Sequence, residues 1–193
     1  MLSLTKHEAA LTQRSPSTEN KIMTYGSKEI GPNRYREDIG RYYEDFTVGD
    51  VYEHRPGRTI SEADNTWFTL LTMNKHPVHF DAHYAAKSEF GKPLVNSALT
   101  LSIVAGMSVS DTSQKAIANL GWNDIRLTAP VFAGDTLYAE SEVLDKRESK
   151  SRPTQGIVKI KTTGTKADGT VFMTYERSML IPKRGHGVDD QME

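Results

Sequence analysis

The sequence predicts an α+β fold in which an antiparallel sheet wraps around one central buried helix. Two observations support this prediction. Residues 96–110 are the most apolar segment of the chain, and their apolar side chains cover nearly all faces of a helix, as in a helix that is buried all round. From residue 119 onward the apolar period changes to two, the spacing of half-buried strands. A buried helix followed by successive strands is typical of α+β domains.

The second half of the chain contains most of the predicted strands. They are expected at 122–132, 137–143, 158–162 and 171–179. Pro130 indicates an edge or a bulge, because proline cannot donate a ladder hydrogen bond. The sequence Ala167-Asp168-Gly169 is typical of a hairpin turn and joins the last two strands.

The first half of the chain predicts a strand, two short helices and an arm. A strand at 51–60 is followed by Ser61, a suitable N-cap for a helix that carries the amphipathic run Trp67-Phe68 and Leu70-Leu71. A second short helix is expected over 82–90. We predict a flexible arm at 1–40, one domain at 41–185 and a flexible tail at 186–193.

Composition excludes several classes of protein. The 193 residues are 37% hydrophobic and 25% charged, with a net charge of −1, so no charge pattern favours nucleic acid or an anionic membrane. No apolar run reaches the roughly 18 residues of a transmembrane helix. The first 20 residues lack the apolar stretch of a secretory signal, and there are no cysteines. A cytoplasmic protein without disulfides is expected.

The most informative segment is Asn74-Lys75-His76-Pro77-Val78-His79-Phe80-Asp81. Imidazole is the side chain best suited to transfer protons near neutral pH. Pro77 interrupts any helix and favours extended geometry at His76, so His79 is expected on a rigid turn between two helices. The other histidines form no recognisable pattern in the sequence.

Three blocks resemble the MaoC-like, or (R)-specific enoyl-CoA, hydratase family. The first is 74–81 followed by Tyr84-Ala85, which is similar to the family's Asp-x-Asn-Pro-x-His-x-Asp motif. The second, at 90–97, is similar to the segment before the family's central helix. The third, at 126–135, is similar to its Pro-Val-x-x-Gly-Asp strand and turn. The variant spelling of the first block, with Arg-Pro-x-Gln-Gly-Ile-Val further on, is most similar to the single-domain subfamily associated with itaconyl-CoA and mesaconyl-CoA.

The resemblance implies a hot dog fold and a hydratase acting on a short, branched or carboxylated enoyl-CoA. It implies no redox cofactor, with coenzyme A present only as part of the substrate. It also implies a homodimer or a higher homo-oligomer, because hot dog protomers usually close their active sites with a partner. The two histidines could suggest a metal site, but stable zinc sites need three or four ligands, so no metal is expected.

The first block departs from the family motif at two positions. Asn74 stands where the family has aspartate, and His76 stands where it has asparagine, while His79 is retained. An amide cannot accept a proton at any useful pH. In one mechanism His79 works alone, with Asn74 orienting the water. In the other, His76 is a second acid or base, although Pro77 makes helical stacking of the two histidines unfavourable.

The remaining site residues follow from the resemblance and from charge. A backbone N–H near the start of the central helix is expected to bind the thioester oxygen, and Ser97 occupies that place, with Asn96 as the helix N-cap. His76 is also a candidate contact to the substrate. An additional carboxylate on the substrate would need a cation, for which the candidates are Lys75, Arg126 and Arg152.

Two other functions remain open. A hot dog thioesterase would act on the same thioesters, but such enzymes typically use a carboxylate to activate water, and Asn74 does not suit that chemistry. A non-catalytic acyl-thioester binding protein would explain the missing aspartate in a different way. His79 could also be a structural histidine held by Asp81 or by a backbone carbonyl.

Overall fold

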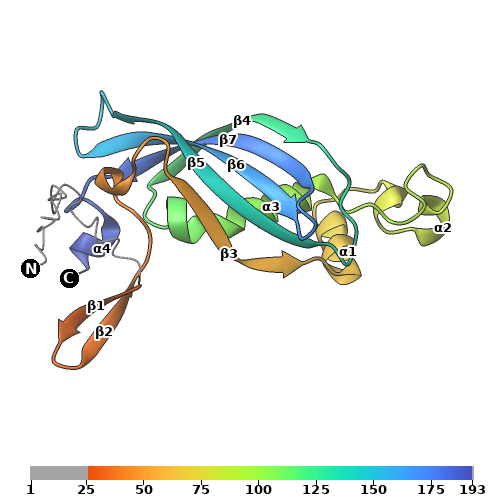
Figure 1. Ribbon diagram of the computed structural model, residues 1–193, viewed down its shortest axis with the longest axis horizontal. Coiled ribbons are helices and arrows are strands. Elements are labelled where there is room, and N and C mark those ends of the chain that lie inside the picture. The colour runs from red at the N-terminus through yellow and green to blue at the C-terminus, as the bar shows by residue number, and fades with distance from the viewer. Residues whose placement is uncertain (1–25, 193) are drawn as a thin grey trace, which may run out of the picture.

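The computed structural model describes residues 26–192 and confirms the α+β architecture. Five antiparallel strands form one sheet in the order β3-β5-β6-β7-β4, and helix α3 lies against it (Figure 1). The strands are β3 (Val51–Thr59), β4 (Ala118–Leu127), β5 (Thr136–Glu148), β6 (Gln155–Lys166) and β7 (Val171–Pro182). The helices are α1 (Glu62–Leu71), α2 (Ala82–Ala85), α3 (Ser97–Met107) and α4 (Val188–Gln191). Short helical turns occur at η1 (Tyr43–Asp45), η2 (Pro77–His79) and η3 (Val109–Ser113).

The long strands β5, β6 and β7 form the centre of the sheet. Their side chains alternate between buried and more exposed positions, as the period of two predicts. The predicted hairpin turn joins β6 to β7, and Gly169 lies there at a φ of +86°, a conformation that glycine adopts without strain. Strand β4 is an edge strand, but it ends at Leu127, so the strand predicted at 122–132 begins and ends earlier and Pro130 lies outside it.

Helix α3 is buried on one face only, so the prediction of burial all round is wrong. Its buried side chains, Leu99, Thr100, Ile103 and Val104, face the sheet side of the molecule. Ala98, Ser102 and Gly106 lie exposed on the opposite face. These three residues are small, so the helix has little apolar surface to hide there despite its apolar sequence.

Helix α1 begins at the predicted N-cap, but the face that it buries is opposite to most of the apolar run. The Ser61 hydroxyl accepts a hydrogen bond from the Asp64 N–H at 3.1 Å, which completes the N-cap. Trp67 is 67% exposed and Leu71 is 76% exposed, so most of the apolar run faces outward, while Phe68 packs against the core. The polar side of the helix is buried instead, because it forms hydrogen bonds to the neighbouring turn and to the start of α3.

Helix α2 is shorter than the 82–90 that the sequence predicts. It ends at Ala85. The next turns close through hydrogen bonds between residues three apart, from the Lys87 N–H to the Tyr84 carbonyl and from the Ser88 N–H to the Ala85 carbonyl, each 3.0 Å. The Ser88 hydroxyl also donates to the Ala85 carbonyl at 2.7 Å. This hydroxyl is a competing donor for the Ala85 carbonyl, which explains the early end.

A layer of polar side chains crosses the core between two apolar clusters. On β5, Ser141 lies between Ala139 of one cluster and Val143 of the other, and on β7, Arg177 lies between Tyr175 and Met179. We call this group the polar layer, and its members are Arg41, His54, Ser108, Asp111, Thr112, Ser141, Thr162 and Arg177. All but Asp111 are buried. The layer ties four strands to the turn that follows α3.

Hydrogen bonds within the polar layer are short. His54 Nδ1 donates to Asp111 at 2.9 Å, and His54 Nε2 contacts the Ser141 hydroxyl at 2.8 Å. Arg177 donates to the hydroxyls of Ser108 at 3.1 Å and Thr112 at 2.8 Å. Burial raises the pKa of the Asp111 carboxyl, but hydrogen bonds from His54 and from Arg41 outweigh burial and leave that pKa below its ordinary value. His54, which forms no pattern in the sequence, is therefore central to the core.

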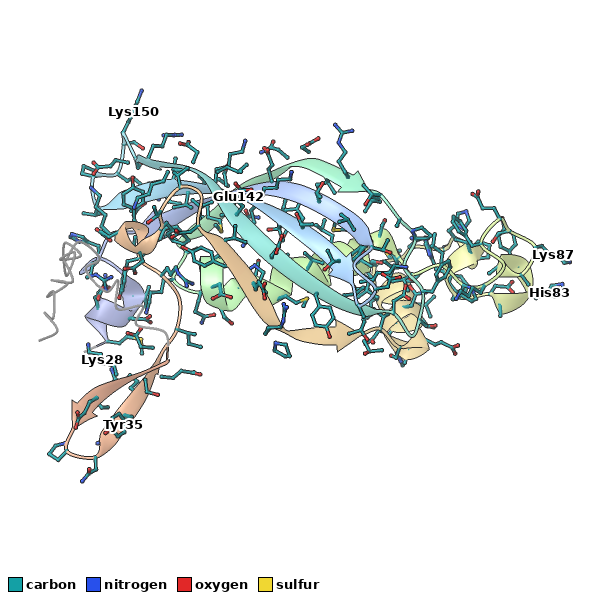
Figure 2. The ribbon with its side chains drawn as sticks, in the orientation of Figure 1. Lys28, Tyr35, His83, Lys87, Glu142 and Lys150 are labelled. Carbon is teal, nitrogen blue, oxygen red and sulfur yellow. The ribbon has the colours of Figure 1, made fainter. Side chains whose placement is uncertain are left out.

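The predicted arm and tail contain regular structure. Strands β1 (Gly26–Gly31) and β2 (Arg34–Asp38) pair as a hairpin that projects away from the sheet; Figure 2 labels Lys28 on β1 and Tyr35 on β2 (Figures 1 and 2). In the tail, the Tyr42 hydroxyl donates to Asp190 of α4 at 2.8 Å. Parts of the segments predicted as flexible thus form a hairpin and a helical turn. Residues 1–25 and 193 lie outside the described residues, and the flexibility of the arm stays a prediction.

Candidate active site

The predicted turn between α1 and α2 is confirmed in its local geometry. Pro77 occupies the first position of η2, where its missing N–H costs nothing. His76 is the N-cap, and its Nδ1 accepts a hydrogen bond from the Val78 N–H at 3.2 Å. Asn74 accepts from the His76 N–H through Oδ1 at 2.9 Å. The amide oxygen of Asn74 therefore holds the turn.

His79 has one ring nitrogen fixed and the other unoccupied. Its Nδ1 lies 2.9 Å from the Leu94 carbonyl oxygen, which can only accept, so Nδ1 carries the proton. Within the described residues no hydrogen bond is formed by Nε2, which therefore carries a lone pair in the neutral ring. The side chain is half-buried. A half-buried imidazole with a fixed tautomer is suited to accept a proton from water.

A buried polar network that sequence reasoning missed holds this turn against α3. Asn65 Nδ2 donates to the His79 carbonyl at 2.7 Å and to the Leu94 carbonyl at 3.0 Å. Its Oδ1 accepts from the Asn96 N–H at 2.8 Å. Asn96 in turn donates to the Thr69 hydroxyl at 3.3 Å. The signal in the sequence was the pair Asn65 and Thr69, four residues apart on a helix and thus on one face.

The first turn of α3 has one backbone donor left over. Asn96 Oδ1 accepts from the Ala98 N–H, and the Asn96 carbonyl accepts from the N–H groups of Leu99 and Thr100. The Ser97 N–H has no acceptor among the described residues, and its residue is exposed. A free donor at the positive end of a helix is the feature expected for stabilising an oxyanion.

The structure brings His76 and His79 together, which Pro77 made unfavourable in a regular helix. Their ring centroids lie 5.9 Å apart with planes at 58°. The Tyr84 ring meets the His76 ring edge-on at 6.1 Å between centroids. The two rings approach each other in the 3-10 turn η2, which an α-helix would not allow, because His76 lies just outside the helical turn as its N-cap.

The three candidate cations lie in different places. Lys75 is exposed on the same turn as the histidines. Arg126 lies on edge strand β4, where Nε donates to Asp124 at 2.7 Å. Arg152 belongs to the β5–β6 turn, which Lys150 marks in Figure 2 at the opposite end of the molecule from α2. Of these three candidate cations, Lys75 is the one that belongs to the turn of the histidines.

A second arrangement resembles a catalytic triad but is enclosed. Ser141, His54 and Asp111 are linked at 2.8 and 2.9 Å, within the distances of a serine nucleophile, its base and the orienting carboxylate. Ser141 and His54 are both 0% exposed, so no substrate carbonyl can reach the hydroxyl. This group belongs to the polar layer of the core.

Two further properties concern the described part of the chain. Within residues 26–192, no three histidine, aspartate or glutamate side chains are placed to hold a metal ion together. No helix within that range is long and apolar enough to cross a bilayer.

Comparison with known proteins places the chain in a family. A family model described as mesaconyl-CoA hydratase matches residues 32–191. The chain belongs to the mesaconyl-CoA hydratase family. The mesaconyl-CoA hydratase of Cereibacter sphaeroides is 31% identical over 149 residues, which are 77% of this chain and 43% of the relative. The resemblance read from the sequence is thereby confirmed.

Solved structures confirm the fold. A MaoC domain protein dehydratase from Chloroflexus aurantiacus superposes with a TM-score of 0.72 at 32% identity, covering 75% of this chain and 41% of that one. A Mycobacterium tuberculosis protein with a double hotdog fold superposes with a TM-score of 0.69 at 23% identity, covering 77% of this chain and 47% of that one. The described residues form one hot dog unit, and the chain spans less than half the length of these two proteins.

Proposed function

We propose that this protein catalyses the reversible addition of water across the α,β double bond of a short enoyl-CoA of the mesaconyl or itaconyl type. The observation that carries the proposal is the fixed tautomer of His79, whose Nδ1 is held by the Leu94 carbonyl, just before α3 in the chain, and whose Nε2 carries the lone pair. The relatives named mesaconyl-CoA hydratase support the substrate class. The proposed reaction needs no redox cofactor and no metal, and coenzyme A enters only with the substrate.

In the proposed reaction, each residue has one task. His79 Nε2 takes a proton from water while the oxygen bonds to the β-carbon, and the same imidazolium returns a proton to the α-carbon. The Ser97 N–H and the positive end of α3 stabilise the charge that develops on the thioester oxygen. Asn96 sets the direction of this N–H as the N-cap. Lys75, exposed on the same turn, is suited to meet a substrate carboxylate.

A panel of CoA thioesters tests this function. The purified chain is expected to hydrate mesaconyl-CoA or itaconyl-CoA, measured as loss of absorbance by the conjugated thioester and as a hydroxyacyl-CoA product by mass spectrometry. Crotonyl-CoA serves as the uncharged comparison. Release of coenzyme A detected with a thiol reagent, without hydrated product, would show a thioesterase. Tight binding with neither product would show a binding protein.

We propose that two copies of the chain form a homodimer through edge strand β4. Edge strand β4 carries the exposed apolar residues Leu120, Trp122, Ile125 and Leu127. The other edge, β3, contains Pro56 and exposed arginines, which discourage pairing. Pairing along β4 would place the hot dog units of two copies side by side in a homodimer, an arrangement for which the double hotdog fold of the Mycobacterium tuberculosis protein is a parallel. A cytoplasmic location stays a prediction from the sequence.

Oligomeric state tests the proposed interface. The chain of 21.6 kDa is expected to elute with twice that mass in light scattering. Ile125→Glu should yield monomers, because it places charge on an apolar edge strand. The control is Val48→Glu, which changes an exposed apolar residue outside the sheet and should leave the dimer intact. A monomeric wild-type chain at micromolar concentration would contradict the proposal.

A further inference from the structure

The two histidines of the turn have opposite tautomers. His76 Nδ1 faces the Val78 N–H, which can only donate, so the neutral His76 ring carries its proton on Nε2. His79 Nδ1 faces a carbonyl and carries the proton there, so its Nε2 accepts. The two neighbouring rings therefore carry one donor, at His76 Nε2, and one acceptor, at His79 Nε2.

The two rings are close neighbours on the turn. Their centroids lie 5.9 Å apart with planes at 58°, so one water at their edges, with hydrogen bonds of about 2.9 Å, can bridge a nitrogen of each ring. A water held in this way would donate to His79 Nε2 and accept from the His76 Nε2–H. His76 is exposed at the surface of the turn, so substrate and solvent can reach it.

Neighbouring groups hold His76 in position. Its backbone N–H is held by Asn74 Oδ1 at 2.9 Å, and the Tyr84 ring packs edge-on against the imidazole. The oxygen of Asn74 is thus used to position His76 and is occupied by that bond.

We propose that His76 is a neutral hydrogen-bond donor that holds the attacking water against His79. This inference rests on the proposed hydratase function. Water gives one proton to His79 Nε2, its oxygen forms the C–O bond at the β-carbon, and the His76 proton stays on Nε2 throughout. In the reverse direction the same N–H donates to the departing hydroxyl oxygen. Asn74 is then a positioning residue that acts through His76.

Two substitutions separate the donor from the cap. His76→Asn keeps a side-chain acceptor for the Val78 N–H, as asparagine is a good N-cap, and removes the Nε2–H. We expect kcat for hydration to fall about 10- to 100-fold, with KM and thermal stability little changed. His76→Gln places an amide N–H near the lost Nε2–H and should restore part of kcat. Wild-type kcat in His76→Asn would overturn the proposal.

The pH profile excludes the acid/base alternative. If His76 only donates a hydrogen bond, His76→Asn lowers kcat at every pH without changing the shape of the profile. If His76 transfers a proton in the reaction, the wild-type profile contains a second ionisation that His76→Asn removes, and that result would overturn the proposal.

A measurement without substrate keeps this inference distinct from the proposed function. Nitrogen-15 NMR of the ring nitrogens at mildly alkaline pH is expected to show His76 protonated on Nε2 and His79 protonated on Nδ1. Any other tautomer at His76 overturns the inference, whether or not the protein hydrates an enoyl-CoA. Absence of hydration by the wild-type chain, with the expected tautomers present, would instead contradict the proposed function.

Discussion

His79→Asn is expected to lower kcat for enoyl-CoA hydration by about 10²- to 10⁴-fold, the usual contribution of a general base. Asparagine can still donate from its side-chain amide toward the Leu94 carbonyl, as His79 Nδ1 does, but it cannot take a proton from water. His79→Ala should lose as much activity and still fold, since Asn65 also donates to the Leu94 carbonyl at 3.0 Å. Initial rates across a pH series and a thermal melt of each variant provide the measurement.

The matched control is a histidine on the next helix. His83 is exposed on α2, at the end of the molecule, where Figure 2 labels it. His83→Ala should keep kcat within about twofold, because surface substitutions away from a site have small effects. Near-normal turnover by both His79 variants would exclude His79 as the base and leave the motif with a structural role.

Asn65→Ala is expected to destabilise the protein by about 2 to 4 kcal/mol, since each buried polar group left without a partner costs about 1 to 3 kcal/mol. The substitution removes the acceptor of the buried Asn96 N–H and the donor to the His79 carbonyl. The turn and the start of α3 should then move apart, and kcat should fall at least about tenfold even in molecules that remain folded. Urea unfolding gives the first quantity and initial rates give the second.

Two further variants sharpen this test. Glu62→Gln changes an exposed residue of the same helix and should shift stability by less than about 0.5 kcal/mol. Asn65→Asp keeps the acceptor but places a carboxylate oxygen against two carbonyl oxygens. It should therefore be more stable at mildly acidic pH, where the protonated acid regains a donor, than at neutral pH. If Asn65→Ala and the wild-type protein unfold at the same urea concentration, the Asn65 network does not contribute to stability.

Local signals accounted for much of the site. Pro77 fixes the turn through its own ring, and the caps at Ser61 and Asn96 depend on residues within three positions of each other. Such signals are complete within a short window of sequence, and all three were predicted correctly. The convergence of His76 with His79 was not predicted, because it depends on a 3-10 turn in which His76 is the cap.

Long-range contacts reversed other predictions. Helix α1 shows an apolar run at Trp67 to Leu71, and amphipathic spacing predicts that this face is buried. The buried face instead carries Asn65 and Thr69, because three backbone groups from distant segments require partners there. His54 likewise gains its role from Asp111, 57 positions away along the chain.

The sequence by itself determined the α+β class, the positions of the main strands and the identity of His79 as the candidate base. Periodicity, turn residues and a short motif are enough for these, because each reflects a preference of the local chain. The tertiary structure decided which nitrogen of each histidine is available, which face of α1 is buried and which helix donor remains free. Those properties depend on hydrogen-bond partners that only folding brings within 3 Å, such as the Leu94 carbonyl against His79.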